Sequence, residues 1–138
     1  MNNPVVDGAG RRVSILIIED DALVATCIGE VLAELGFAVA GVASTGSEAL
    51  SVAQETHPSL ALVDIRLAGP MDGVEVAEAL RDRFGIRVIF LSGLRDQKTA
   101  ERAQAARPLG FLPKPFRPSQ VFNAIEQALA QIPCEGVG

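Results

Sequence analysis

The sequence has few of the side chains that bind zinc or form disulfides, and it lacks two of the three aromatic types. Its 138 residues include no tryptophan, no tyrosine, one histidine and two cysteines. Cys27 and Cys134 lack the spacing of metal ligands, and we expect Cys27, on an apolar helical stripe, to be a buried core thiol. His57 precedes Pro58, where we expect a solvated turn residue. A cysteine- or histidine-based metal centre is therefore disfavoured.

Long apolar runs and basic clusters are also missing. No run approaches the roughly 20 apolar residues of a membrane-spanning helix. The residues from Met1 to Pro4 lack the basic-then-apolar order of a secretory signal. The formal net charge of −5 disfavours nucleic acid and membrane as partners. No GxxxxGK sequence supports a nucleotide phosphate loop. We expect a soluble, cytoplasmic protein.

What is present is the pattern of one compact α/β domain. Hydrophobic residues make up 49% of the chain, enough for a three-layer core. Apolar runs alternate with helical periodicities, which is typical of a parallel sheet covered on both faces. We place the domain at residues 13–132, between tails at residues 1–12 and 133–138. Strands are predicted at residues 15–18, 38–43, 60–64, 86–91 and 111–113.

Local signals mark the helices between these strands. The first helix carries an apolar stripe from Leu23 to Leu35 and is expected to end at Gly36. Thr45 and Glu48 form a predicted capping box for the second helix. The third is expected after the loop at residues 66–72. The last two are predicted at residues 97–106 and 118–131. The helix at 97–106 is rich in alanine, so its grip on the sheet should be weak.

Polar residues follow four of the predicted strands at the point where each strand ends. Glu19 and Asp20 come after the first strand, and Asp64 ends the third. Ser92 follows the fourth strand and Lys114 the fifth. Because the carboxyl ends of parallel strands share one edge of the sheet, we expect these three carboxylates, the hydroxyl and the ammonium group to meet there.

Such a cluster predicts a divalent-metal and phosphate site. Two like charges about 4 Å apart repel by roughly 4 kcal/mol at an effective dielectric constant near 20, so clustered carboxylates call for a cation. Hard oxygen ligands suit Mg²⁺ or Mn²⁺. A carboxylate beside such a metal can attack a phosphoryl donor and become an aspartyl phosphate. Asp64, alone at its strand end, is the expected nucleophile.

Over about residues 13–131 the chain resembles the receiver domain of response regulators in two-component signalling. The resemblance implies a flavodoxin-like fold with five parallel strands in the order 2-1-3-4-5. The magnesium ligands that it implies are Glu19, Asp20, Asp64 and the backbone carbonyl of Arg66. The residues that it implies for phosphoryl chemistry are Asp64 as acceptor, with Ser92 and Lys114.

The same resemblance implies a conformational switch. Phosphate would draw Ser92 inward, and Phe111, which has no hydroxyl where the family often has tyrosine, would fill the vacated space. The Lys114-Pro115 peptide is expected to be cis. The surface that transmits the change would be the helix at residues 97–106, the fifth strand and the last helix.

The loop after the acceptor aspartate departs from the family pattern. Receivers usually have proline four residues beyond the phosphorylated aspartate, where this chain has Ala68. The Asp-Gly pair that follows falls one position late, which implies a one-residue insertion. Arg66 and Leu94 occupy positions that tune phosphate lifetime in the family. We expect the Arg66 side chain either to close over the phosphate or to pair with Glu19.

The expected role follows from the family. A histidine kinase or a histidine phosphotransfer protein would supply the phosphoryl group, and a downstream protein would receive the signal. We expect a stand-alone receiver rather than an enzyme, because it would catalyse only part of its own phosphorylation and hydrolysis. The sequence leaves monomer and homodimer open.

Two other classes share part of the pattern. Dehalogenase-like phosphatases also combine an acid cluster with a lysine, but they need a second aspartate two residues after the nucleophile, where this chain has Arg66. A phosphate-independent interaction module with the same fold would be marked by loss of an acid or of the lysine, and all are present. Asp21, the third acid in its run, is expected to open the first helix.

Overall fold

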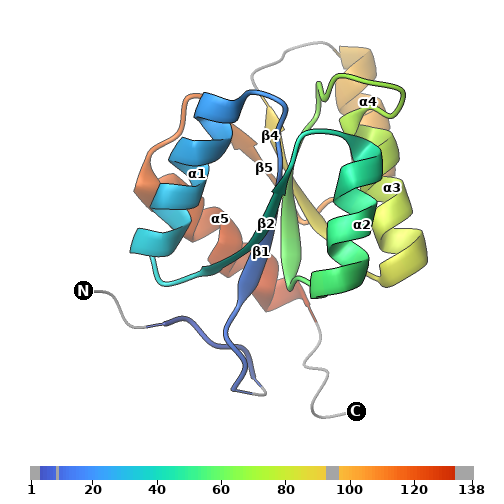
Figure 1. Cartoon of the computed structure of the whole chain (residues 1–138). Helices are drawn as coiled ribbons and strands as arrows, with labels where there is room; N and C mark the ends of the chain where they lie inside the picture. Colours follow the sequence, from blue (N-terminus) through green and yellow to red (C-terminus); the bar gives the residue numbers. More distant parts are fainter. Residues whose placement is uncertain (1–3, 9, 93–96, 133–138) are drawn as a thin grey trace.

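A five-stranded parallel sheet forms the centre of the molecule (Figure 1). The computed structural model describes residues 4–8, 10–92 and 97–132. The strands are β1 (Ser14–Ile18), β2 (Ala38–Ala43), β3 (Leu60–Asp64), β4 (Val88–Ser92) and β5 (Gly110–Pro113). Their order is β2-β1-β3-β4-β5 and all neighbours are parallel, which confirms the predicted flavodoxin-like arrangement.

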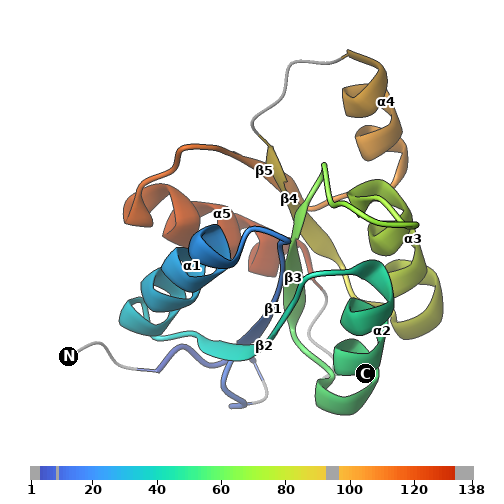
Figure 2. The same ribbon diagram turned by 45° about the horizontal axis from the view of Figure 1, so that its top comes forward.

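Helices cover both faces of this sheet. They are α1 (Ala22–Glu34), α2 (Gly46–Thr56), α3 (Gly73–Phe84), α4 (Gln97–Ala105) and α5 (Pro118–Gln131). α1 and α5 lie on one face, and α2 and α3 on the other (Figure 2). Along β1, Ile15 and Ile17 pack towards α1 and α5, while Leu16 and Ile18 pack towards α2 and α3. Both faces are covered, which explains why the central strands are apolar throughout.

Side-chain and glycine caps fix the helix ends close to where the sequence predicts them. Asp21 accepts hydrogen bonds from two backbone N–H groups in the first turn of α1, which confirms its helix-opening role. Gly36, with a left-handed φ of 96°, follows the end of α1. Thr45 accepts from the N–H of Glu48, but the Glu48 carboxylate accepts from Ser44 instead of from Thr45. One bond of the predicted capping box is therefore formed by Thr45, whereas the N–H that bonds the Glu48 carboxylate belongs to the preceding residue, Ser44.

The buried face of the first helix overlaps the predicted stripe but is rotated from it: Ile28 and Leu32 of the stripe are buried, whereas one edge of the stripe faces outward. Cys27 is exposed, so the prediction of a buried thiol is wrong, and Leu23 on the same stripe is 74% exposed. A helix turns by about 100° per residue, which places these two residues nearly opposite Ala25, Ile28 and Leu32. The latter three are buried against the sheet. The apolar residues of α1 are too widely spread to share one stripe.

Element boundaries differ slightly from those predicted. β4 begins at Val88 instead of Ile86. α4 ends at Ala105 instead of Ala106, because Arg107 takes a left-handed φ of 57° and turns the chain away. α5 has the predicted bounds. Within the described ranges, none of the helices combines the length and the apolar character needed to cross a membrane.

α4 is held mainly by polar contacts. Among the α4 side chains that the structure describes, Ala103 is the buried one. Arg102 forms an ion pair with Asp72 at 3.0 Å, and Arg81 donates to the carbonyl of Ala106 at 2.8 Å. Figure 2 shows α4 at the rim of the molecule, above α3. This arrangement agrees with the weak apolar grip expected from its alanine-rich sequence.

The described part of the predicted N-terminal tail lies against the domain. The N–H of Val5 donates to the carbonyl of Gly36 at 2.9 Å, and the carbonyl of Val5 accepts from Val13 at 2.8 Å. Val6 and Arg12 form an antiparallel bridge across the turn between them. Val5 is partly buried against the cluster beneath α1 and α5. These residues therefore extend the packed structure beyond the start of β1.

Candidate functional site

Three carboxylates meet where β1 and β3 end side by side. Oxygen atoms of Glu19, Asp20 and Asp64 all lie within 4.8 Å of one another. Glu19 is 2% exposed and Asp64 is 8% exposed, whereas Asp20 faces solvent. Because β1 and β3 are parallel neighbours, their carboxyl ends bring residues far apart in sequence to one edge of the sheet.

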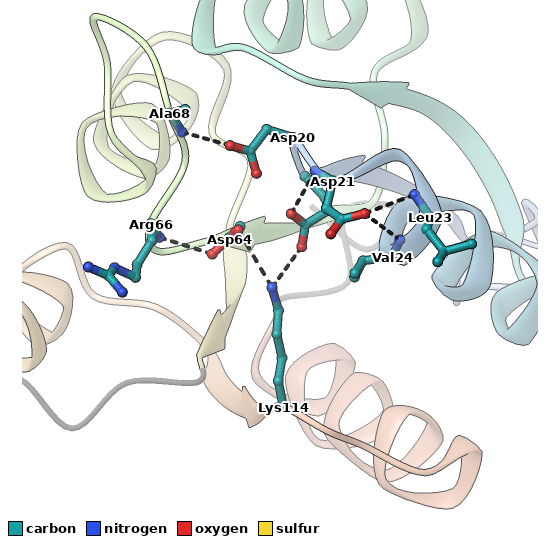
Figure 3. A network of polar contacts seen from close by, with 9 residues as sticks. Asp20, Asp21, Leu23, Val24, Asp64, Arg66, Ala68 and Lys114 are labelled. Atoms are coloured by element: carbon teal, nitrogen blue, oxygen red, sulfur yellow. Dashed lines mark hydrogen bonds and ion pairs between the residues drawn. The ribbon is translucent and has the colours of Figure 1, made fainter.

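Lys114 reaches into this cluster from the end of β5 (Figure 3). Its Nζ lies 2.8 Å from Oε1 of Glu19 and 3.5 Å from Oδ2 of Asp64. The peptide between Lys114 and Pro115 is cis, as the sequence predicts. The backbone N–H of Lys114 also donates to the carbonyl of Ser92 at 2.8 Å, which joins the ends of β4 and β5.

The pocket carries more negative than positive charge. Burial raises the pKa of Glu19 above its ordinary value, and Asp64 raises it further against the opposing hydrogen bond from Lys114. Burial alone would lower the pKa of Lys114, but the hydrogen bond to Glu19 and the charge of Asp64 raise it instead. Two largely buried carboxylates therefore share one ammonium group, and a further cation would offset the remaining charge.

Backbone N–H groups hold two of the acids by short local bonds. Asp21 donates to Oε2 of Glu19 at 3.1 Å, and Arg66 donates to Oδ1 of Asp64 at 2.9 Å. In Figure 3 the Arg66 side chain extends away from Asp64. Lys114 occupies the place beside Glu19, so the alternative in which Arg66 pairs with Glu19 is wrong. The Arg66 side chain is exposed.

Two further residues singled out from the sequence, Ser92 and Phe111, lie on β4 and β5. Ser92 is half-buried at the end of β4 and is aligned with Pro113 of β5. Phe111 is 37% exposed, and its ring centroid lies 5.8 Å from that of Phe90 in a tilted arrangement. Leu94 lies outside the described residues.

The donor set fits Mg²⁺ or Mn²⁺. The clustered side chains offer carboxylate oxygens only, and their mutual repulsion favours a small cation between them. Glu19 and Asp64 are already oriented by backbone N–H groups, each of which leaves lone pairs on the carboxylate available. The residues that could hold the cation are Glu19, Asp20 and Asp64, together with the backbone carbonyl of Arg66 named from the sequence.

Two features of the site are not evident in the sequence. A cleft of about 410 Å³ lies beside Glu19 and Asp20, between the first turns of α1 and the end of β2, and Glu48 stands on its wall. In addition, the N–H of Ala68 donates to Oδ2 of Asp20 at 3.2 Å. The sequence signals that this loop differs are Ala68 in place of the usual proline and the Asp-Gly pair one position late, and neither predicts this hydrogen bond.

Similarity to known proteins agrees with this geometry. The response regulator receiver domain family matches residues 15–126. This chain belongs to that family. It is therefore a receiver domain of a response regulator, consistent with phosphorylation-based signalling, and the observed strand order is that of a receiver.

Curated relatives of this receiver are longer proteins. It is 38% identical over 133 residues to the phyllosphere-induced regulator PhyR of Methylorubrum extorquens, covering 91% of this chain and 49% of PhyR. It is 31% identical over 134 residues to the transcriptional regulatory protein PdtaR of Mycobacterium tuberculosis, covering 95% of this chain and 64% of PdtaR. The chain thus spans about half the length of PhyR and under two thirds of PdtaR.

Solved receivers share the fold of this domain. The signal receiver domain of a modulated diguanylate cyclase from Desulfovibrio desulfuricans superimposes with a TM-score of 0.82 and is 37% identical in sequence. The matched region covers 86% of this chain and 94% of that domain. The similarity therefore extends over nearly the whole solved domain.

Proposed function

We propose that this receiver accepts a phosphoryl group on Asp64, in the cytoplasm, from a histidine kinase or a histidine phosphotransfer protein. The observation that carries the proposal is the position of the Asp64 carboxylate. It lies beside the oxygens of Glu19 and Asp20 and 3.5 Å from the ammonium group of Lys114. A nucleophile, a place for a divalent cation and a positive side chain thus occupy one pocket.

In the transfer step, a carboxylate oxygen of Asp64 forms a bond to phosphorus while the phosphorus–nitrogen bond of the donor phosphohistidine breaks. The electron pair of that bond stays on the imidazole, which takes up a proton and leaves. The product is an acyl phosphate on Asp64. Lys114 holds a phosphoryl oxygen, because its ammonium group already lies near the carboxylate that is attacked.

The acids around Asp64 would hold Mg²⁺ or Mn²⁺. We assign Glu19, Asp20, Asp64 and the backbone carbonyl of Arg66 to this role. The cation, when bound, supplies charge neutralisation at the oxygens of the transferring group. Asp20 is the most accessible of the three carboxylates, whereas Glu19 is buried and contacts Lys114.

The phosphorylated state would differ from the resting state at Ser92 and Phe111. The Ser92 hydroxyl binds a phosphoryl oxygen, and the half-exposed ring of Phe111 turns into the space beside β4. α4 follows readily, because polar contacts hold it with little apolar burial. A protein target recognises the change on α4, β5 and α5. The receiver that it binds is either a monomer or a homodimer.

This receiver turns over no external substrate in the proposed scheme. Water attacks the acyl phosphate on Asp64 and releases inorganic phosphate, which resets the switch. Arg66 and Leu94 set how readily water reaches the phosphorus. The expectation of a stand-alone regulator stays a prediction, as does the choice between direct signalling and a relay step.

The proposal is tested by incubating the protein with acetyl phosphate, with and without Mg²⁺, and recording the intact mass. We expect one Mg²⁺-dependent phosphoryl adduct on the wild type and none on Asp64→Ala. An adduct that persists in Asp64→Ala would place the phosphoryl group elsewhere. No adduct on the wild type, together with no Mg²⁺ binding, would favour a phosphate-independent interaction module with a receiver fold.

A further inference from the structure

One hydrogen bond ties the exposed acid of the cluster to the loop after β3. The N–H of Ala68 donates to Oδ2 of Asp20 at 3.2 Å, across 48 positions of sequence (Figure 3). The other two acids receive N–H groups from residues only two positions further along the chain. Among the three acids, Asp20 is thus the one that accepts a backbone N–H from a distant part of the sequence, whereas the distant partner of Glu19 is the side chain of Lys114.

The geometry of the loop aims this N–H at Asp20. The side chain of Leu67, immediately before Ala68, is 4% exposed and packs into the core beneath α2 and α3. Gly69, immediately after, has a left-handed φ of 110°, which turns the chain outward and favours glycine. Ala68 itself is exposed, so its side chain contributes little. A buried anchor and a turn therefore fix the direction of the backbone group between them.

The donor exists because this position is not proline. A proline residue has no backbone N–H and cannot make this bond. Because the bond engages Oδ2, it leaves Oδ1 of Asp20 available to a cation and restricts rotation of the carboxylate. Hydrogen bonds that orient metal ligands in this way commonly change metal affinity by about 10- to 100-fold when they are removed.

We propose that the backbone N–H of Ala68 is a positioning group of the divalent-cation site, acting through Asp20. The inference rests on the proposed function, because it requires Asp20 to be a metal ligand. It adds a contribution from the altered loop: the loop holds the solvent-facing ligand in place, and the cation then binds to a carboxylate that is already oriented.

The bond is tested most selectively by replacing the Ala68 amide with an ester, which removes the N–H and leaves the side chain unchanged. Mn²⁺ binding to the phosphate-free protein is measured from the electron paramagnetic resonance signal of free Mn²⁺. Ala68→Pro is the genetic counterpart of the ester. Ala68→Ser retains the N–H and is the matched control, and Asp20→Asn serves as the loss-of-ligand reference.

We expect the ester to weaken Mn²⁺ binding by about tenfold, the low end of the usual range, because the bond is exposed to solvent. Ala68→Ser should bind Mn²⁺ like the wild type. Equal or tighter binding by the ester would overturn the proposal, as would an equal loss in Ala68→Ser. If the wild type itself binds no Mn²⁺, the metal site fails, and the failure is then of the proposed function and not of the loop alone.

Discussion

Lys114 donates a hydrogen bond to Glu19 at 2.8 Å, whereas its Nζ lies 3.5 Å from Asp64. In the phosphate-free receiver the ammonium group is therefore closer to Glu19 than to the expected phosphoacceptor. Glu19 is 2% exposed and has no other charged partner as close among the described residues. A phosphoryl group on Asp64 would add negative oxygens on the other side of the ammonium. We therefore interpret Glu19 as the resting partner of Lys114, from which the lysine moves when phosphate arrives.

Replacing Lys114 should have opposite effects on cation binding and on phosphorylation. Lys114→Gln removes the positive charge from a pocket of carboxylates, so we expect divalent cations to bind several-fold more tightly. The phosphoryl adduct should form more slowly, because one stabilising charge is lost from the transferring group. Mn²⁺ titration and intact mass measure the two effects, with Arg117→Gln as an exposed control. Unchanged or weaker cation binding in Lys114→Gln would contradict the charge balance described here.

Ser92→Ala should leave cation binding nearly intact while weakening the switch. Ser92 stands at the end of β4, on the far side of β3 from the acids of β1, and its role in the proposal begins only when a phosphoryl group is present. Amide chemical shifts of the phosphorylated protein, recorded for residues of α4 and β5, provide the measurement. If Ser92→Ala shows the same phosphorylation-induced shifts as the wild type, the proposed switch is wrong.

Arg66→Ala should change the lifetime of the acyl phosphate more than its formation. The Arg66 side chain is exposed and points away from Asp64 in the resting state, so it is able to close over a phosphoryl group and shield it from water. We expect a several-fold shorter lifetime and a nearly unchanged initial rate of phosphorylation. Decay of the adduct mass after removal of acetyl phosphate reports the lifetime, and Arg83→Ala is the control. Equal lifetimes for Arg66→Ala and the wild type would rule out this role.

Asp72 should make stability depend on pH in the acid range. Partial burial opposes the shift, but hydrogen bonds from the N–H of Glu75 and from Arg102 hold the pKa of Asp72 below its ordinary value of 3.8. A carboxyl group whose pKa is lower in the folded state contributes stability that is fully present above the unfolded pKa and is lost as the pH falls through the folded pKa. The loss therefore begins as the pH falls to about 3.8 and below.

Thermal unfolding of the wild type and Asp72→Asn, followed from neutral to acid pH, checks this expectation. Asparagine can still cap α3, so the comparison isolates the charge and its pairing with Arg102. The wild type should be more stable near neutral pH, and the difference in melting temperature should shrink below about pH 4. A difference that is constant down to pH 3 would show that the Asp72 charge is not its source.

The place of the site could be predicted from the sequence because it depends on topology alone. Once Glu19, Asp20 and Asp64 are assigned to the carboxyl ends of neighbouring parallel strands, they must lie close together, because these ends share one edge of the sheet. The role of Asp21 as a helix cap was likewise predictable, since capping is a local interaction. Local signals and sheet topology thus account for most of the pocket.

The orientation of individual side chains is harder to predict from the sequence than the place of the site. Cys27 is predicted to lie in the core because the apolar residues of α1 extend over a wide arc of the helix, and the sheet covers only the part of that arc that contains Ile28 and Leu32. The hydrogen bond from Ala68 to Asp20 depends on how Leu67 packs and on the backbone conformation of the loop. No periodicity in the sequence encodes such a contact.

The central claim is that Asp64 is the phosphoacceptor, and chemical trapping tests it most directly. Borohydride reduces an acyl phosphate to an alcohol, so phosphorylated aspartate is converted to homoserine at its position in the chain. After treatment with acetyl phosphate and Mg²⁺, peptide mass mapping should find homoserine at position 64, and none there when Mg²⁺ is omitted. Homoserine at another aspartate, with position 64 unchanged, would contradict the account.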